Sequence, residues 1–470
     1  MFAKIQRIHF VGIGGIGMSG IAEVLLNLGY KITGSDLKSS ALTQRLAGLG
    51  ATTFEGHASE NVQGADVVVT SSAIAADNPE VVEARRLHIP VIQRAEMLSE
   101  LMRLKYGIAI AGMHGKTTTT SMVAAILAAG GLDPTVVVGG RVDAMGSNAR
   151  LGKSQYLVAE ADESDRSFLK LSPILSIVTN IDREHMDCYR NMRDIKQTFL
   201  DFMDRVPFYG MVVACNDDPI LRKLLSQVQR RVITYGTRRG SDFLIKPGAI
   251  EPQLGEHRPL SHFRVSYRGK EFGEFVLHVP GLHNVLNATA AIAAGIGLDV
   301  DVETIRAALE NFRGVDRRFQ LRGRVRGISV VDDYGHHPTE IKATLAAARQ
   351  CGFGKIHVIF QPHRYTRTQE LMDEFAGAFH DADSLTILDI YAASEAPIAG
   401  VTAEVLIERI RGGGSQVAVY AKSFSEAVDT VSHRANDGDL ILTLGAGSVS
   451  QLGPLILERL QGQQAASTTG

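Results

Sequence analysis

The sequence predicts an α/β protein of three domains, built on doubly wound and mostly parallel sheets. A chain of 470 residues is too long for one ordinary hydrophobic core, and typical domain sizes suggest about three domains. Short apolar runs of strand length alternate with helical patterns along most of the chain, which is typical of βαβ units. We expect a Rossmann-like domain at 1–104, a central α/β domain at 105–313, a Rossmann-like domain at 314–462 and a disordered tail at 463–470.

Composition and charge exclude several classes of function. Apolar residues make up 45% and charged residues 21% of the chain, as in soluble globular proteins. The 49 basic and 51 acidic residues give a formal charge of −2, so no basic field attracts nucleic acid or an anionic membrane. The three cysteines lack C-x-x-C spacing, which argues against a disulfide framework or a zinc site. We expect a cytoplasmic protein, because the sequence shows neither a signal segment nor an apolar run of membrane-spanning length.

The first domain begins with a glycine motif. Its expected elements are strands at 8–11, 31–34 and 65–70 and a helix at 18–28. Gly12, Gly14 and Gly17 satisfy G-x-G-x-x-G directly after the first strand, and Asp36 follows about twenty residues on, as in dinucleotide-binding folds. The motif brings a pyrophosphate close to the backbone, and UDP meets that description as well as NAD does. An NAD-dependent oxidoreductase is therefore one interpretation, and the motif alone does not distinguish NAD from UDP as the ligand.

A phosphate-binding loop opens the central domain, which is therefore of the P-loop ATPase type. The segment GMHGKT at 112–117 follows an apolar run at 106–111 and precedes a helical pattern. Glycines let backbone N–H groups turn inward, Lys116 can reach the terminal phosphates, and Thr117 can hold Mg²⁺ at a helix N-terminus. The loop is shorter than G-x-x-x-x-G-K-S/T, because Ile110 stands at the first glycine position. A glycine-rich turn before an ordinary helix is the alternative, but the strand before the loop and the hydroxyl run after it favour ATP.

Two polar segments follow further strands of the central domain. One, at 160–165, comes after an apolar run at 156–159, and the other, at 179–185, ends a run at 175–179. Ligands of open α/β sheets bind at the carboxyl ends of strands, and carboxylates buried there without a cation are costly. We therefore expect the acidic segment at 160–165 to bind Mg²⁺ and His185, one strand beyond, to make a second metal or phosphate contact. A solvated acidic loop and a structural histidine are the alternatives.

The remaining patterns complete the two later domains. The central domain is expected to add a strand at 210–214, antiparallel strands within 243–279 and an alanine-rich helix at 284–296. Strands separated by helical patterns follow in the last domain, at 328–331, 356–360, 385–388, 416–419 and 440–444. A pyrophosphate site followed by an ATP loop favours an enzyme that joins a nucleotide-activated substrate to a phosphoryl donor over a dehydrogenase.

Taken together, these motifs resemble the Mur ligase family, the ATP-dependent amide-forming enzymes of peptidoglycan precursor synthesis. The segments that carry the resemblance span nearly the whole chain: GIGGIGMS at 12–19, GMHGKTTT at 112–119, EADESD at 160–165, GLHNVLN at 281–287, DDYGHHP at 332–338 and QPHRYTR at 361–367. Met113 departs from the threonine that is usual in this branch, and we expect little effect because the loop backbone binds the phosphates.

The resemblance implies a role for each domain. The first would bind the UDP part of a substrate through Gly14, Gly15, Ile16, Gly17, Met18, Ser19, Asp36, Ser71 and Ser72. The second would bind ATP through Gly112, Met113, His114, Gly115, Lys116, Thr117, Thr118, His283 and Asn287, and Mg²⁺ through Thr117, Glu160 and His185. The third would bind an amino acid, and the catalytic residues implied are Lys116, His336, Arg364 and Arg367.

The implied reaction joins L-alanine to the lactyl carboxylate of UDP-N-acetylmuramate through an acyl phosphate made with ATP. Arginine suits bidentate binding of carboxylates, whereas an exposed basic loop is the plainer reading of Arg364 and Arg367. A recycling ligase that adds a murein tripeptide to the same sugar nucleotide is an alternative, which Tyr334 before the two histidines disfavours. A nucleotide-binding sensor without catalysis would need neither the acidic loop nor the arginines. We expect a monomer or weak homo-oligomer that binds neither nucleic acid nor membrane, and that closes about hinges near Leu104 and Gly314.

Overall fold

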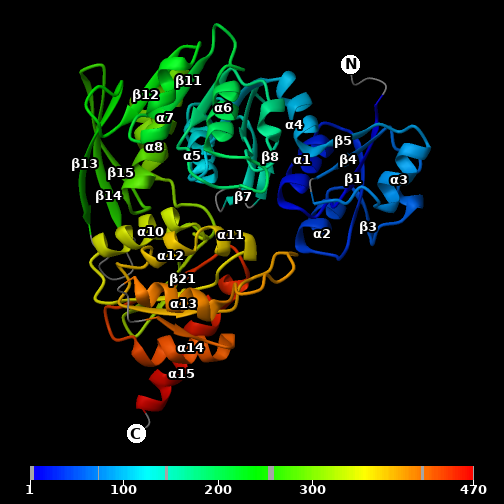
Figure 1. Ribbon diagram of the computed structural model, residues 1–470. Coiled ribbons are helices and arrows are strands. Elements are labelled where there is room, and N and C mark those ends of the chain that lie inside the picture. Colours follow the sequence, from blue (N-terminus) through cyan, green and yellow to red (C-terminus); the bar gives the residue numbers. More distant parts are fainter. Residues whose placement is uncertain (1–4, 72, 143–146, 252–258, 414–417, 469–470) are drawn as a thin grey trace. The chain divides into compact units, whose positions relative to one another are not determined.

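The computed structural model describes residues 5–71, 73–142, 147–251, 259–413 and 418–468. Its strands form three sheets, which follow one another along the chain and confirm the α/β fold class (Figure 1). The chain divides into two compact units, one of Met1–Lys246, Arg264–Phe275 and Leu286–Phe312 and the other of Pro247–Phe263, Val276–Val285 and Arg313–Gly470. Of the helices described, none has the length and apolar character needed to cross a membrane.

The first sheet has five strands in the order β3-β2-β1-β4-β5, and all of its pairs are parallel. The strands are β1 (Arg7–Val11), β2 (Lys31–Asp36), β3 (Thr52–Glu55), β4 (Val67–Thr70) and β5 (Val91–Gln93). The helices are α1 (Ile16–Asn27), α2 (Ala41–Gly48), α3 (Pro79–Arg86) and α4 (Arg94–Arg103). The strand order reverses between β1 and β4, and ligands of such sheets bind at this switch point. The glycine motif begins at the carboxyl end of β1 and therefore lies at the switch point.

The second sheet has ten strands in the order β15-β14-β13-β12-β11-β10-β6-β9-β7-β8. The strands are β6 (Tyr106–Ala111), β7 (Thr135–Val142), β8 (Ser147–Arg150), β9 (Tyr156–Glu160), β10 (Leu175–Val178), β11 (Met211–Cys215), β12 (Val232–Gly236), β13 (Phe243–Glu251), β14 (Leu260–Tyr267) and β15 (Lys270–Leu277). The helices are α5 (Lys116–Ala129), α6 (Met192–Met203), α7 (Pro219–Leu224), α8 (Leu282–Gly297) and α9 (Val302–Glu310). β6 lies between β10 and β9, parallel to both, so the phosphate loop after β6 is flanked by the polar segments that follow those two strands.

The third sheet has six strands in the order β16-β17-β21-β18-β19-β20. The strands are β16 (Gln320–Val325), β17 (Ile328–Asp333), β18 (Ile356–Phe360), β19 (Ser384–Ile387), β20 (Ala418–Tyr420) and β21 (Leu440–Leu444). The helices are α10 (Pro338–Gln350), α11 (Tyr365–Glu370), α12 (Met372–Ala376), α13 (Ala403–Gly412), α14 (Phe424–Arg434) and α15 (Leu452–Thr468). β16 is antiparallel to β17, and the pairs from β17 to β20 are parallel. The strand expected at 416–419 is β20, and residues 416 and 417 lie outside the described part of the chain.

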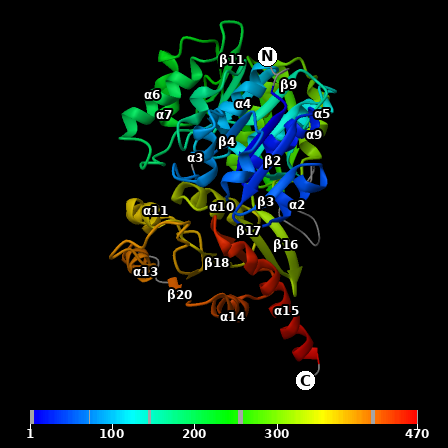
Figure 2. The ribbon, with the colours of Figure 1, turned by 90° about the vertical axis from the view of Figure 1, so that its right-hand side faces the viewer.

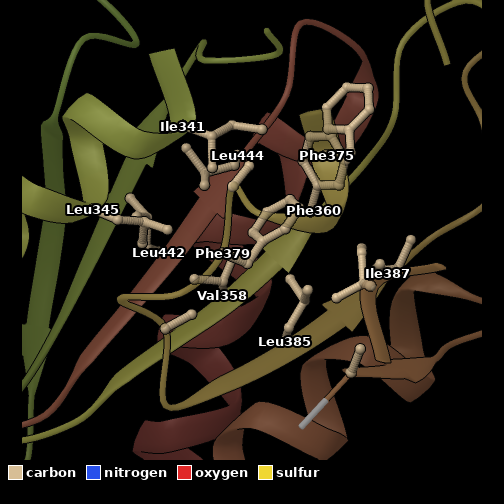
Figure 3. Packing of buried hydrophobic residues seen from close by; sticks show 14 of the residues in the cluster. Ile341, Leu345, Val358, Phe360, Phe375, Phe379, Leu385, Ile387, Leu442 and Leu444 are labelled. Carbon is tan, nitrogen blue, oxygen red and sulfur yellow. The ribbon is translucent and has the colours of Figure 1, made fainter. Parts of the chain in front are cut away.

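Helices cover both faces of the third sheet, which explains why β17, β18, β19 and β21 are buried at every residue. Neighbouring residues of β21 illustrate this, because Leu442 packs in one apolar cluster and Ile441 in the other. The first cluster is shown in Figure 3, where Ile341 of α10 and Phe375 of α12 lie over the strand residues. The second cluster includes Ile456 of α15, and Figure 2 shows this helix beside β16 and β17.

The end of the chain differs from expectation. We expected a disordered tail at 463–470, but α15 continues to Thr468. The sequence at 463–466 is Gln-Gln-Ala-Ala, which has high helix propensity and so continues a helix already anchored by its earlier turns. Residues 469–470 lie outside the described part.

Candidate active site

The phosphate loop adopts a conformation that requires glycine at two positions. The φ angles of Gly112 and Gly115 are +132° and +83°, in the region that side chains rarely adopt. A Cβ atom on Gly112 would lie 2.0 Å from the Thr179 hydroxyl, and one on Gly115 would lie 2.6 Å from Oδ1 of Asn287. Asn287, which was expected to contact ATP, therefore lies directly against the loop.

The segment after β10 holds the loop in shape. The backbone N–H of His114 donates to Oδ1 of Asn180 at 2.9 Å, and the His114 carbonyl accepts from Thr179 Oγ1 at 2.6 Å and Asn180 Nδ2 at 2.9 Å. The His114 ring contacts Asp182 through Nε2 at 3.0 Å. The sequence drew attention to this segment for His185, but the roles of Asn180 and Asp182 were missed. Their position after the strand that neighbours β6 is the signal that would have indicated them.

Lys116 lies across the loop that precedes it. Its ammonium group donates to the carbonyls of Gly112 at 2.7 Å and Met113 at 3.1 Å, and to Oε1 of Glu163 at 2.8 Å. Burial disfavours the charged amine, but the Glu163 carboxylate outweighs this effect and raises the pKa of Lys116 above its ordinary value. Lys116 is therefore a fixed cation at the N-terminus of α5, where anionic phosphates are favoured.

Three of the four acids in the segment at 160–165 have different partners among the residues expected at the site or near it. Glu160 accepts a hydrogen bond from Thr117 Oγ1 at 2.7 Å, which brings together two of the expected metal ligands. Asp162 accepts from Arg94 Nη2 at 3.1 Å, and although burial raises the pKa of Asp162, the charge of Arg94 lowers it overall. Glu163 binds Lys116, as described above. Sequence reasoning included Glu163 in the acidic segment but gave it no role, because its pairing with Lys116 depends on the fold.

His185 lies beside Glu163. Its Nε2 is 3.5 Å from Oε1 of Glu163 and 4.0 Å from Oε2 of Glu184. Burial lowers the pKa of His185, but hydrogen bonding to Glu163 and the charge of Glu184 raise it overall. The backbone φ of His185 is +57°, an unusual value for a non-glycine residue. Thr117 therefore contacts Glu160 and His185 lies beside Glu163, and both acids belong to the segment at 160–165.

The donor atoms of this loop suit a divalent cation that prefers oxygen. Glu163 is fully buried, and its Oε2 has no hydrogen-bond partner among the described residues. A buried carboxylate oxygen without a partner is unfavourable, and a cation would satisfy it. Hydroxyl and carboxylate oxygens are the ligands that Mg²⁺ prefers, so Thr117, Glu160 and Glu163 fit this ion.

In the first glycine motif, Asp36 binds the loop itself. Its Oδ2 accepts from the Gly14 N–H at 2.8 Å, and Oδ1 accepts from the N–H of Leu37 at 2.8 Å. Met18 and Ser19 are buried, whereas Gly15 and Ile16 are exposed at the start of α1. Ser71 follows β4 at the same end of the sheet, and Ser72 lies outside the described residues. Gly15 and Ile16 are therefore the most exposed of the described residues expected to bind UDP, and Ser71 is partly exposed at the end of the neighbouring strand.

Arg94 links this motif to the acidic loop. A Cβ atom on Gly17 would lie 3.1 Å from Cδ and Nη1 of Arg94, so this arginine packs against the first turn of α1. The same guanidinium group binds Asp162. Sequence reasoning missed Arg94, which nothing in its local sequence distinguishes from an ordinary helix-start residue.

In the second unit, side chains from several strand ends form a ladder of rings. His336 lies 5.3 Å from Tyr334 and 5.9 Å from His363, and His363 stacks on Tyr391 at 5.5 Å, all as centroid distances. Arg367 Nη1 lies 3.2 Å from Nδ1 of His363. The pKa of His363 is lowered to about 3, first by burial, then by the charge of His336 and then by the nearby arginines. The ring is therefore neutral and can accept a hydrogen bond from Arg367. His363 and Tyr391 were missed from sequence, although His363 directly precedes Arg364.

The two adjacent histidines differ in role. His337 caps α10, because its Nδ1 accepts from the N–H of Thr339 at 3.3 Å, and its side chain is buried. The His336 ring instead belongs to the ladder. Arg364 has a φ of +70° and donates its N–H to the Tyr391 carbonyl at 2.8 Å. His336, Arg364 and Arg367 are therefore brought to one end of the third sheet.

His283 lies in the second unit, whereas Asn287 lies in the first. Burial, followed by the charge of Arg318, lowers the pKa of His283 to about 4. Its Nε2 is 3.1 Å from Nδ2 of Asn284. Met113 and Thr118 of the phosphate loop have buried side chains, so any nucleotide contact from them would come through the backbone.

Comparison with known proteins finds that sequence models of one protein family match successive parts of the chain. Sequence models described as "Mur ligase family, catalytic domain", "Mur ligase middle domain" and "Mur ligase, glutamate ligase domain" match residues 7–106, 110–295 and 317–447. A UDP-N-acetylmuramate–L-alanine ligase of Koribacter versatilis is 70% identical over 99% of this chain and 100% of its own length. The crystal structure of UDP-N-acetylmuramate-alanine ligase from Thermotoga maritima is similar with a TM-score of 0.81 and 31% identity, covering 97% of this chain and 99% of that one. A murein peptide ligase from Psychrobacter arcticus aligns with a TM-score of 0.68 and 26% identity, covering 97% and 98%.

Proposed function

This chain belongs to the Mur ligase family, and from that premise we propose that it joins L-alanine to the lactyl carboxylate of UDP-N-acetylmuramate. The reaction would consume ATP and yield UDP-N-acetylmuramoyl-L-alanine, ADP and phosphate. The full-length similarity to the Koribacter alanine ligase is the observation that carries this proposal. The phosphate loop with its acidic neighbours and the arginine and histidine cluster supply the two kinds of site that the reaction needs.

The first half of the reaction would take place at the phosphate loop. A carboxylate is a poor acceptor for an amine, so it is first converted to an acyl phosphate by attack of its oxygen on the γ-phosphorus of ATP. Lys116 and the N-terminus of α5 would neutralise the charge of the transferred phosphoryl group. Mg²⁺ held by Thr117 and Glu160 would add to this neutralisation.

The second half would use the ring ladder of the second unit. Arg364 and Arg367 would bind the carboxylate of alanine or the acyl phosphate. The neutral His363 ring keeps Arg367 in place by accepting from it, and His336 lies next to this ring. The amine nitrogen of alanine would then attack the acyl carbon, form the amide bond and release phosphate. Water must be kept away at this stage, because it would hydrolyse the acyl phosphate.

The exposed backbone at 15–16 and Ser71 would bind the UDP part of the substrate. Because Asp36 is committed to Gly14 and Leu37, we propose that it maintains the loop rather than binding a ribose directly. This arrangement disfavours the oxidoreductase reading, in which the acidic residue contacts the ribose of NAD.

A recycling ligase is the second candidate, favoured by the alignment with the Psychrobacter murein peptide ligase. The decisive measurement is phosphate release from the purified protein with ATP, Mg²⁺ and UDP-N-acetylmuramate. L-Alanine, the tripeptide L-Ala-γ-D-Glu-meso-diaminopimelate and no amine are compared. We expect release that depends on both L-alanine and the sugar nucleotide. A preference for the tripeptide would support the recycling ligase, and equal background with all three would contradict both.

A further inference from the structure

The three hydrogen-bond donors of the Lys116 ammonium group have protein partners. The group contacts the carbonyls of Gly112 and Met113 and Oε1 of Glu163 at 2.7, 3.1 and 2.8 Å. An ammonium group has three N–H donors and no acceptor, so a phosphate that binds Lys116 must replace at least one of these partners. Of the three partners, only Glu163 carries a full negative charge and therefore competes directly with a phosphate.

Glu163 is held firmly in this position. Its side chain is fully buried, and its backbone carbonyl accepts a hydrogen bond from the hydroxyl of Tyr189 at 2.5 Å. Its carbonyl also accepts from the N–H of Arg166 at 3.1 Å. The carboxylate therefore cannot swing into solvent without disturbing a buried part of the unit.

The charge of Glu163 is only partly compensated. Oε1 binds Lys116 and lies 3.5 Å from Nε2 of His185, whereas the buried Oε2 has no partner among the residues that the structure describes. A polyphosphate that reached Lys116 would bring further negative charge to this place and leave Glu163 without its cation. Two like charges at close range in a partly desolvated site repel strongly.

We propose that Glu163 acts as an electrostatic gate on the phosphate loop, which holds Lys116 and admits a nucleoside triphosphate only when a divalent cation accompanies it. The cation replaces the positive charge of Lys116 beside Glu163 once the phosphates bind Lys116. The unpartnered Oε2 of Glu163 could then bind the cation. This inference rests on the proposed function, because it assumes that the loop binds ATP. Glu163 would thus act on the nucleotide indirectly, both through Lys116 and through the cation.

The test is equilibrium binding of the ATP analogue AMP-PNP to the full-length protein, measured by calorimetry with excess Mg²⁺ and with EDTA. The wild-type protein should bind much more weakly in EDTA. Glu163→Gln should tighten binding in EDTA by about tenfold, because the neutral amide no longer competes for Lys116. Binding with Mg²⁺ should weaken or stay the same, so the ratio of the two dissociation constants should fall.

Matched variants separate this gate from a general effect of charge. Asp165→Asn removes an acid of the same loop whose carboxylate accepts from Ser167 at 2.9 Å, and it should leave the ratio unchanged. Glu160→Gln should weaken binding with Mg²⁺ without strengthening binding in EDTA. If Glu163→Gln does not fold, as judged by its melting temperature, Glu163→Met carries the same expectation, because an apolar chain of similar length suits the buried position.

The outcomes distinguish failure of the gate from failure of the proposed function. An unchanged ratio in both Glu163 variants, with normal binding by the wild-type protein, would overturn the gate and leave the ligase proposal intact. Equal tightening by Asp165→Asn would also overturn it. A wild-type protein that binds AMP-PNP in neither condition would overturn both.

Discussion

At the scale of single residues, two glycines with positive φ angles serve different purposes. Gly112 and Gly131 both have positive φ angles, of +132° and +74°. The space for a Cβ atom differs, because Thr179 Oγ1 would lie 2.0 Å from one on Gly112, whereas no atom lies within 4 Å of one on Gly131. Backbone strain and steric conflict can therefore be separated in the same unit.

We expect Gly131→Ala to reduce the free energy of unfolding by about 1 kcal/mol, the usual cost of a left-handed non-glycine residue, and to leave nucleotide binding unchanged. Gly112→Ala should cost more, by roughly 1–3 kcal/mol beyond this strain, and abolish nucleotide binding, because the loop must move away from Thr179. Urea unfolding and calorimetric titration with AMP-PNP measure the two effects. Nucleotide binding that survives in Gly112→Ala would contradict the assignment of the loop.

A second residue-scale feature is the buried carboxylate of Glu80 in the first domain. It accepts from Ser35 Oγ at 2.5 Å and from Asn61 Nδ2 at 2.6 Å, and His9 Nε2 lies 3.6 Å away. Burial alone would raise the pKa of Glu80, but His9, Ser35 and Asn61 lower it from 4.5 to about 2. The folded state therefore binds a proton at Glu80 less readily than the unfolded chain does.

The stability that Glu80 contributes should be complete above pH 4.5 and should disappear as the pH falls from about 4.5 to about 2. A pKa shift of this size corresponds to a contribution of roughly 3 kcal/mol to the free energy of unfolding. Glu80→Gln should therefore show a smaller loss of unfolding free energy than the wild-type protein between pH 6 and pH 2.5. Urea unfolding at both pH values measures this, with Glu60→Gln as an exposed control. Identical pH dependence in wild type and Glu80→Gln would show that Glu80 is not the responsible group.

At the scale of elements, the strands of the three sheets could be predicted and several contacts of the site could not. Apolar runs such as those that became β1, β6 and β18 were located nearly to the residue, because strands buried on both faces consist mostly of apolar side chains. The glycine loop and its lysine were identified for a similar reason, since the backbone conformation restricts the residue types. The strands β3, β7, β8, β12 and β16 were missed, although β7 contains the short apolar run Val136–Val138.

The roles of site residues that depend on neighbours in space could not be predicted from the sequence. Glu163 stands three positions after Glu160 in one acidic segment, and local sequence does not indicate which acid faces Thr117 and which faces Lys116. His336 and His337 present the same difficulty. Only the position at which α10 begins determines that His337 caps the helix while the His336 ring packs against His363. The tail beyond 462 shows the reverse case, in which composition suggested disorder although its glutamines and alanines favour a helix.

The last helix provides an element-scale prediction. Ile456 of α15 is fully buried against the third sheet, so Ile456→Ala should reduce the free energy of unfolding by about 2–5 kcal/mol. Deleting residues 463–470 removes none of the buried residues Leu452, Ile456 and Leu460 and should change stability by about 0.5 kcal/mol or less. Urea denaturation of both variants provides the comparison. A deletion as costly as Ile456→Ala would show that the end of α15 makes contacts essential to the fold.

At the scale of the whole molecule, the proposed reaction needs three ligands bound by different parts of one chain. The phosphate loop lies in the first compact unit, and Arg364 and Arg367 lie in the second. An acyl phosphate made in one unit must meet an amine bound in the other, so we propose that the chain closes about hinges near Leu104 and Gly314 during the cycle. Gly314 has a φ of +99°, a conformation suited to glycine at a connection.

Small-angle X-ray scattering tests this closure. The radius of gyration should decrease when AMP-PNP, Mg²⁺ and UDP-N-acetylmuramate are added together, because closure brings the substrate sites together. Each ligand alone should have a smaller effect. Superimposable profiles with and without the full set of ligands would contradict closure, and a concentration series with the same samples excludes association as the cause of any change.

The support that the phosphate loop receives from the segment after β10 has a consequence for binding kinetics. Asn180, Thr179 and Asp182 fix the loop through its own backbone and the His114 ring. Little conformational entropy is then lost in the loop when a nucleotide arrives, so more of the interaction energy appears as affinity. Association should follow a single bimolecular step whose rate rises linearly with nucleotide concentration, without a slow ordering phase.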